Sequence, residues 1–202
     1  MAYTNFNWIL DNLAVGAMVE GPDELPFDAI LSLETIAPAN LRDLVTSGEM
    51  DYQWHSITDG VMDAPYETIV AHFNRAADQI HAWVSQDKRT LVHCFAGISR
   101  APTTATWYLV RHRGMTWDEA LATIERVRPI VRPYVGFEVA LRLESGERLT
   151  EEWLQERVAA YVARIKRDLD LDVDPARYYT ELEASGTLDR LRESSLEPST
   201  SR

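Results

Sequence analysis

Short apolar segments alternate with longer segments of helical periodicity over the first 146 residues of the chain. The short segments are rich in β-branched and other apolar residues and are bounded by turn signals, which is typical of strands. We expect strands at Phe6–Ile9, Leu13–Val15, Asp28–Leu33, Tyr52–Ile57 and Arg89–His93. The longer segments predict helices at 39–46, 65–84, 102–113, 117–128 and 134–145. This alternation indicates an α/β fold with a mainly parallel central sheet flanked by helices.

Beyond residue 146 the strand segments stop and only helical patterns remain. Thr150 is placed to cap a helix whose apolar residues keep helical spacing as far as Ile165. A second, short helix is expected from Asp174 to near Gly186, and residues 197–202 have the composition of a disordered end. The sequence therefore predicts a domain at 1–146 and an acidic, helical C-terminal extension at 147–202.

Composition narrows the class of protein. A chain of 202 residues can bury one good core. The sequence contains no run of 18 apolar residues, so no membrane span is expected. The N-terminus shows no basic segment followed by an apolar one, so no secretory signal is expected. The single cysteine excludes an intrachain disulfide and a multi-cysteine zinc site. These features lead us to expect a cytoplasmic protein.

Charge is distributed unevenly along the chain. The formal net charge of −12 argues against nucleic acid or an anionic membrane as a general partner. The segment from Lys88 to Arg132, however, contains eight basic residues and only three acidic ones. Most of these basic residues are expected on solvated helix faces, but the local excess suits an anionic ligand.

The acidic run Asp168–Asp174 is the one segment with a superficial likeness to a metal site. It lacks the central glycine and the terminal glutamate of a calcium loop. We therefore expect no metal there and no cofactor elsewhere.

The lone cysteine, Cys94, stands between a predicted strand and a predicted helix. A thiolate is a strong nucleophile, and a helix N-terminus, loop N–H groups and a nearby guanidinium all stabilise it. The same N–H groups could hold a phosphate, which Arg100 would grip through its planar fork. Gly97 would allow the tight turn that makes these donors converge. The predicted phosphate-binding residues are Phe95, Ala96, Gly97, Ile98, Ser99 and Arg100.

An aspartate is the natural proton donor for a leaving group at such a site. Asp59 lies 35 residues before Cys94, at the end of a neighbouring predicted strand, and a glycine follows it. Asp63 lies in the same loop and is the alternative. We predict Asp59 as the general acid.

Three separate segments resemble the cysteine-dependent dual-specificity protein phosphatases. His93-Cys94 with Arg100 six residues after the cysteine matches that family's signature, as do the segments 73–78 and 128–137. The resemblance covers roughly residues 5–144. It implies a phosphocysteine intermediate on Cys94, Asp59 as acid and then base, supporting roles for His93 and Thr103, and no metal.

One departure from the family pattern concerns the second chemical step. The family usually has Ser or Thr directly after the arginine, where the hydroxyl supports the thiolate as a leaving group. This chain has Ala101 there, so slower hydrolysis of the phosphoenzyme is expected unless Thr103 or Thr104 compensates. The family's Asn and Gln in the later segment are Tyr134 and Ala140 here.

The leading hypothesis is a hydrolase of phosphotyrosine, and of phosphoserine or phosphothreonine, in proteins. The same chemistry could instead serve a phosphoinositide, an RNA 5′-triphosphate or a small phosphorylated metabolite. Ala101 also leaves open a pseudophosphatase that binds phosphoproteins without turnover. A low-molecular-weight phosphatase or an arsenate reductase is disfavoured, because those families place the cysteine loop near the N-terminus. The oligomeric state leaves no mark in the sequence.

Overall fold

The computed structural model describes residues 5–18, 26–35, 50–58 and 64–196. The predicted helix at 39–46, both candidate acids Asp59 and Asp63, and the tail 197–202 lie outside the described residues. The chain divides into two compact units, Met1–Asp59 with Ala71–Tyr134 and Gly60–Val70 with Val135–Arg202. The domain boundary at residue 146 stays a prediction.

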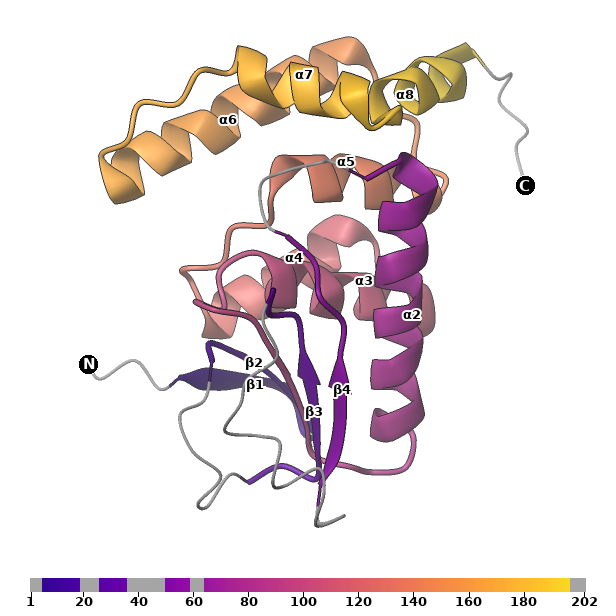
Figure 1. The fold of residues 1–202 in the computed structure, drawn as a ribbon, viewed down its shortest axis with the longest axis vertical. Helices are drawn as coiled ribbons and strands as arrows, with labels where there is room; N and C mark the ends of the chain where they lie inside the picture. The colour runs from indigo at the N-terminus through magenta and orange to yellow at the C-terminus, as the bar shows by residue number, and fades with distance from the viewer. Residues whose placement is uncertain (1–4, 19–25, 36–49, 59–63, 197–202) are drawn as a thin grey trace. The chain divides into compact units, whose positions relative to one another are not determined.

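The first unit is built on a sheet that, in the described residues, has the strand order β1-β2-β5-β3-β4 (Figure 1). Only β1 and β2 pair antiparallel, and the other neighbours are parallel. The strands are β1 (Phe6–Leu10), β2 (Leu13–Gly16), β3 (Ala29–Ser32), β4 (Asp51–Trp54) and β5 (Thr90–His93). The expected α/β class with a mainly parallel sheet is confirmed.

The register puts the ends of the parallel strands at one edge of the sheet. Gly16, His93, Ser32 and Trp54 form one row across β2, β5, β3 and β4. The loops that follow these strands therefore leave the sheet side by side. In open α/β sheets this carboxyl edge is where sites form.

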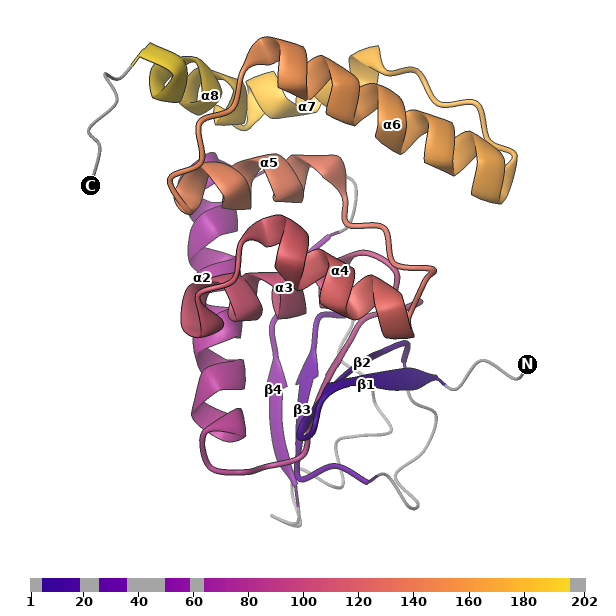
Figure 2. The same cartoon turned by 180° about the vertical axis from the view of Figure 1, so that it is seen from behind.

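Apolar side chains bury both faces of the sheet. On one face, α3 (Arg100–Arg113) packs against β5 and β2, and α4 (Trp117–Val127) packs against β1 (Figure 2). The alternate positions of the strands point to the opposite face, because successive strand side chains alternate. The cluster there consists of Ala14, Phe27, Ile30 and Leu91, with Phe6, Trp8, Met50 and Tyr52 packed around it.

Several helix ends follow local sequence signals. Thr116 and Glu119 form the predicted capping box, in which the threonine hydroxyl accepts from the Glu119 amide and the Glu119 carboxylate accepts from the Thr116 amide. Gly114 ends α3 with a φ of 69°. Pro65 precedes α2 (Tyr66–Val84), and its carbonyl accepts the first bonds of that helix.

The fourth predicted strand is shorter than expected. The sequence predicts Tyr52–Ile57, whereas β4 covers Asp51–Trp54. The carbonyl of Ile57 accepts a hydrogen bond from the Arg100 side chain instead of pairing with a strand. The chain thus leaves the sheet early to meet an arginine from another element.

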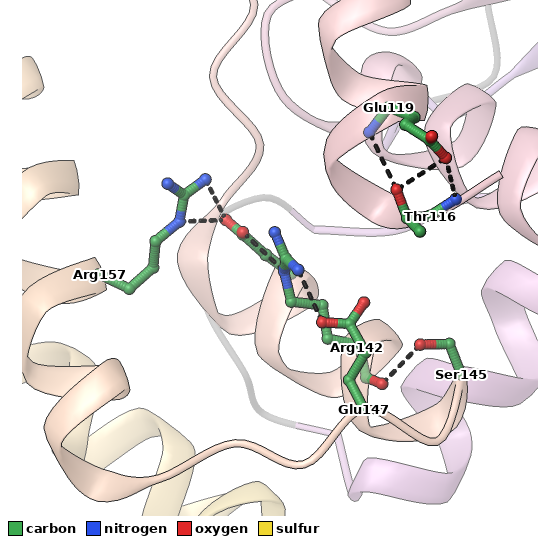
Figure 3. A network of polar contacts seen from close by, with 7 residues as sticks. Thr116, Glu119, Arg142, Ser145, Glu147 and Arg157 are labelled. Carbon is green, nitrogen blue, oxygen red and sulfur yellow. Dashed lines mark hydrogen bonds and ion pairs between the residues drawn. The ribbon is translucent and has the colours of Figure 1, made fainter.

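The second unit consists of the first turn of α2 and the helices after Tyr134. An ion network joins α5 (Val135–Glu144) to α6 (Glu151–Leu169), with the buried Glu138 carboxylate between Arg142 and Arg157. Figure 3 shows Arg142, Arg157 and Glu147 of this network. Arg142 also pairs with Glu147 at 2.7 Å. Thr150 caps α6 as predicted.

The extension contains one helix that the sequence pattern did not indicate. After α7 (Ala176–Ala184) and the turn at Gly186, α8 (Thr187–Leu196) follows. Only Thr187, Leu188 and Leu191 of α8 are buried, which is too sparse an apolar pattern to stand out. Packing of α8 against α5 supplies what the local pattern lacks.

Candidate active site

Cys94 lies at the carboxyl edge of the sheet, directly after β5. Because β5 runs between β2 and β3, the cysteine emerges from the middle of the sheet. Cys94 is 2% exposed, and its backbone amide donates to the Gly16 carbonyl at 3.4 Å. The nucleophile predicted from the sequence therefore sits on a rigid support.

The loop after Cys94 turns its carbonyl groups outward. The Phe95 carbonyl accepts from the Met18 amide at 3.1 Å, and the Ile98 carbonyl accepts from the Arg132 amide at 2.6 Å. Between them, the Ala96 and Gly97 carbonyls accept from the Arg128 side chain at 3.1 and 2.8 Å. These four contacts fix the orientation of four successive peptide groups.

The orientation of the carbonyls decides where the amides point. A trans peptide group directs its N–H and its C=O to opposite sides. The N–H groups of Ala96, Gly97, Ile98 and Ser99 therefore point away from these outer partners, toward the inside of the loop. Converging backbone N–H groups at a helix N-terminus form an anion site. The contacts thus orient the amides of Ala96, Gly97, Ile98 and Ser99 as an anion site requires, and phosphate binding by the predicted residues stays a prediction.

Gly97 is the position where only glycine fits. Its φ is 63°, a left-handed conformation that side chains disfavour. A Cβ atom there would lie 2.4 to 2.7 Å from the backbone of Gly16 and Ala17. The loop Phe95–Ser99, which we call the phosphate loop, therefore lies directly against the end of β2.

Arg100 opens α3 and is 8% exposed. Its Nη1 donates to the carbonyls of Leu33 at 2.9 Å and Ile57 at 3.2 Å. These bonds hold one corner of the guanidinium against the segments that follow β3 and β4. The opposite edge, formed by Nε and Nη2, is the edge that guanidinium groups use for side-on bidentate contacts with oxyanions.

Glu34 is a site residue that the sequence reasoning missed. Its Oε2 lies 4.0 Å from Nη2 of Arg100, and about a tenth of each side chain is exposed. Burial raises the pKa of Glu34, and the Arg100 charge opposes this shift. Its Oε1 meets no hydrogen-bond donor among the described residues. An acid after a buried strand was the signal that selected Asp59, and the same signal would have found Glu34.

Arg128 was also missed as a site residue, although its segment was part of the resemblance. It is 4% exposed, and its side chain donates to two carbonyls of the loop and to the Asn7 side chain in β1. Its separation from Gly97 by 31 residues leaves no local signal for this contact.

Ala101, Thr103 and Thr104 direct no hydroxyl proton to the cysteine. Ala101 is fully buried and has no hydroxyl. The hydroxyls of Thr103 and Thr104 donate to the carbonyls of Ser99 and Arg100, each at 2.9 Å. Neither threonine therefore compensates for Ala101 in this structure, because each hydroxyl has one proton to donate. His93 is fully buried, and burial lowers its pKa to about 4.

Ion pairs within the fold engage some of the eight basic residues from Lys88 to Arg132. Four of them pair with acids from earlier in the chain. The pairs are Lys88–Asp51, Arg89–Asp28, Arg100–Glu34 and Arg111–Asp78. These pairs reduce the local excess of positive charge, while Arg100 and Arg128 contact the loop after Cys94 or the segments beside it.

No helix among the described residues is long and apolar enough to span a membrane. Within the same residues, no group of histidine, cysteine or acidic side chains has the arrangement of a metal site. Lys166 pairs with Asp170 and Asp172 in the acidic run that superficially resembles a calcium loop.

Comparison with known sequences decides the family. The sequence model of the dual specificity phosphatase catalytic domain matches residues 14–145. The chain belongs to this family. The match agrees with the range of the resemblance seen in the sequence, and residues 146–202 lie outside it.

Individual dual specificity phosphatases resemble parts of the chain. Dual specificity protein phosphatase 22-B of Danio rerio is 34% identical over 96 residues, which are 46% of this chain and 52% of the relative. Dual specificity protein phosphatase 15 of Rattus norvegicus is 35% identical over 112 residues, 54% of this chain and 47% of the relative. The matches thus span about half the length of these curated relatives.

Solved structures of dual specificity phosphatases share the fold. The crystal structure of DUSP15 superposes with a TM-score of 0.59 at 26% identity and covers 76% of this chain and 97% of that chain. Human DUSP28 gives a TM-score of 0.58 at 22% identity, with 75% and 96% covered.

Proposed function

We propose that this chain is a cysteine-dependent phosphatase that hydrolyses phosphotyrosine, and also phosphoserine or phosphothreonine, in proteins. The observation that carries the proposal is the loop after Cys94, whose four outward carbonyls leave four amides directed toward its inside. Family membership supports the same reaction. A cytoplasmic location stays a prediction.

The first step transfers the phosphoryl group to the enzyme. The Cys94 thiolate attacks phosphorus, so that the S–P bond forms while the bond to the leaving oxygen breaks. The inward amides and Arg100 stabilise the charge on the phosphoryl oxygens. Asp59 gives its proton to the leaving oxygen. Asp59 follows Ile57 by two residues in the chain, and the Ile57 carbonyl is bound by Arg100.

The second step releases phosphate. Water attacks the phosphocysteine, Asp59 takes a proton from it, and the S–P bond breaks to return the thiolate. A hydrogen-bond donor beside the sulfur would help it leave. Because Ala101 has no hydroxyl and Thr103 and Thr104 donate elsewhere, this step is expected to limit turnover.

The alternative substrates have less support. The named relatives are protein phosphatases, and four of the eight basic residues that suggested an anionic ligand pair with carboxylates. We therefore do not propose a phosphoinositide, an RNA 5′-triphosphate or a small metabolite as the substrate. A screen of phosphopeptides against these ligands checks the choice.

Rapid kinetics with an aryl phosphate test the reaction itself. We expect a burst of one phenolate per enzyme followed by slower steady-state release, and Cys94→Ser should show neither. A burst without any later turnover would instead favour the pseudophosphatase. Absence of a burst and of turnover in the wild-type protein would refute the proposal.

The leaving-group dependence of turnover tests the general acid. Asp59→Asn should lower turnover of poor leaving groups by about 10²–10⁴-fold while activated aryl phosphates lose much less. Asp63→Asn is the matched control. If Asp63→Asn shows this pattern and Asp59→Asn does not, the acid has been assigned to the wrong residue.

A further inference from the structure

The four outward carbonyls of the phosphate loop are held in two different ways. Backbone amides of Met18 and Arg132 bind the first and the last of them, at Phe95 and Ile98. No substitution of those donor residues other than proline removes an amide. The two middle carbonyls, at Ala96 and Gly97, are instead bound by the Arg128 side chain. The centre of the loop therefore depends on this side chain.

The guanidinium of Arg128 is placed for this task. Its Nε donates to Gly97 at 2.8 Å and its Nη2 to Ala96 at 3.1 Å, so one edge of the planar group spans two successive carbonyls. Its Nη1 donates to the Asn7 side chain at 2.9 Å, which anchors the group to β1. Burial lowers the pKa of Arg128, but the nearby Cys94 charge opposes the shift, and a guanidinium stays charged.

All three of these partners are neutral oxygens. A carboxylate in their place would cancel the positive charge behind the loop, whereas carbonyl and amide oxygens leave it to act on a bound anion. Lysine could not replace the group, because a single ammonium lacks the fixed fork that two parallel bonds require.

We propose that Arg128 is a positioning residue that sets the anion affinity of the phosphate loop. By holding the Ala96 and Gly97 carbonyls outward, it aims the amides of Gly97 and Ile98 at the phosphoryl oxygens. This role rests on the proposed function of the loop. Arg128 does not touch the substrate.

Alkylation of Cys94 provides the test, since it is the chain's only cysteine and its labelling is unambiguous. The probe is inorganic phosphate, measured by the concentration that halves the rate of modification by iodoacetamide. A second readout is the rate with anionic iodoacetate relative to neutral iodoacetamide. Both report the anion site and not overall stability.

The variants separate the fork from the charge. Arg128→Lys keeps the charge and loses the fork, and we expect phosphate protection to weaken about tenfold. Arg128→Met keeps only the apolar stem and should weaken it about 100-fold. The iodoacetate preference should fall in the same order. Arg126→Lys and Arg126→Met at an exposed position two residues earlier are the matched controls, expected within about twofold of wild type.

Thermal unfolding of each variant shows whether it is folded, and Arg128→Lys carries the test if Arg128→Met is not. Unchanged phosphate protection in folded Arg128→Lys would overturn the positioning role while leaving the proposed function intact. A wild-type protein that phosphate does not protect would overturn the anion site, and the role of Arg128 with it.

Discussion

Buried arginines organise two networks in this molecule, and their partners differ. In the first unit Arg128 binds carbonyl and amide oxygens, all of them neutral. In the second unit Arg142 and Arg157 bind the Glu138 carboxylate, and Arg142 also binds Glu147 (Figure 3). The first network orders a backbone and leaves its positive charge to act on a ligand, whereas the second neutralises itself.

This difference separates a functional site from a structural one. A self-neutralised ion network joins two helices but offers nothing to an anion. A buried cation among neutral oxygens still attracts a bound phosphate electrostatically, because few mobile charges screen the interaction there. The chemistry of the partners, and not burial of the arginine alone, distinguishes the two.

The largest expected effect is in the structural network. Glu138→Ala should destabilise the protein by about 3–5 kcal/mol, because it leaves Arg142 buried without its main partner. The free energy of unfolding from denaturant titration measures this. Glu147→Ala, which removes a half-exposed partner of the same arginine, should cost no more than about 1 kcal/mol. Equal losses of unfolding free energy for the two variants would contradict the role of Glu138 as the main partner of Arg142.

Acid should weaken the first unit through histidines that burial keeps neutral, and His72 and His93 have the largest shifts. Burial lowers the pKa of His72 and of His93 to about 4, from 6.5. The folded state therefore favours the neutral rings, so their contribution is complete above pH 6.5 and is lost as the pH falls toward 4. Each accounts for at most about 3 kcal/mol over that range.

Denaturant titrations at several pH values between 7 and 4 measure how steeply the free energy of unfolding falls with pH. His72→Phe should make this dependence less steep. If the His72→Phe variant keeps the pH dependence of the wild type, His72 is not responsible.

Two glycines with similar backbone test how tightly the phosphate loop is packed. Gly97 and Gly146 have φ values of 63° and 85°, but only at Gly97 would a Cβ meet other atoms. Gly97→Ala should therefore be less stable than Gly146→Ala by about 1–3 kcal/mol and should also lose turnover. Similar thermal midpoints and similar turnover in the two variants would refute the close contact with β2.

The smallest expected effect is an increase in the rate of phosphoenzyme hydrolysis. Ala101→Ser should speed hydrolysis of the phosphoenzyme by about tenfold through a hydrogen bond to the leaving thiolate. The burst rate should not change, since it reports the first step. Ala105→Ser makes the same change one turn further along α3 and should have no kinetic effect. If Ala101→Ser leaves steady-state turnover unaltered, the second step is not limited by the missing hydroxyl.

The parts of the fold that the sequence predicted are those with local causes. The capping box at Thr116, the end of α3 at Gly114 and the strand before Cys94 each depend on residues within a few positions of one another. The arrangement of helices around a central sheet followed from the alternation of helical and strand patterns, and the family resemblance pointed to the same fold. Short-range sterics and hydrogen bonds decide these features, so they can be read along the chain.

Tertiary structure alone decided which distant groups complete the site. Glu34 stands beside Arg100 and Arg128 holds Gly97 because the sheet and helices bring together residues 66 and 31 positions apart. The same holds for Lys88 and Arg89, whose charges are cancelled by acids from other elements. Composition records how many charges a chain has, but the energy of each charge depends on its burial and its partner, and only the folded chain sets these.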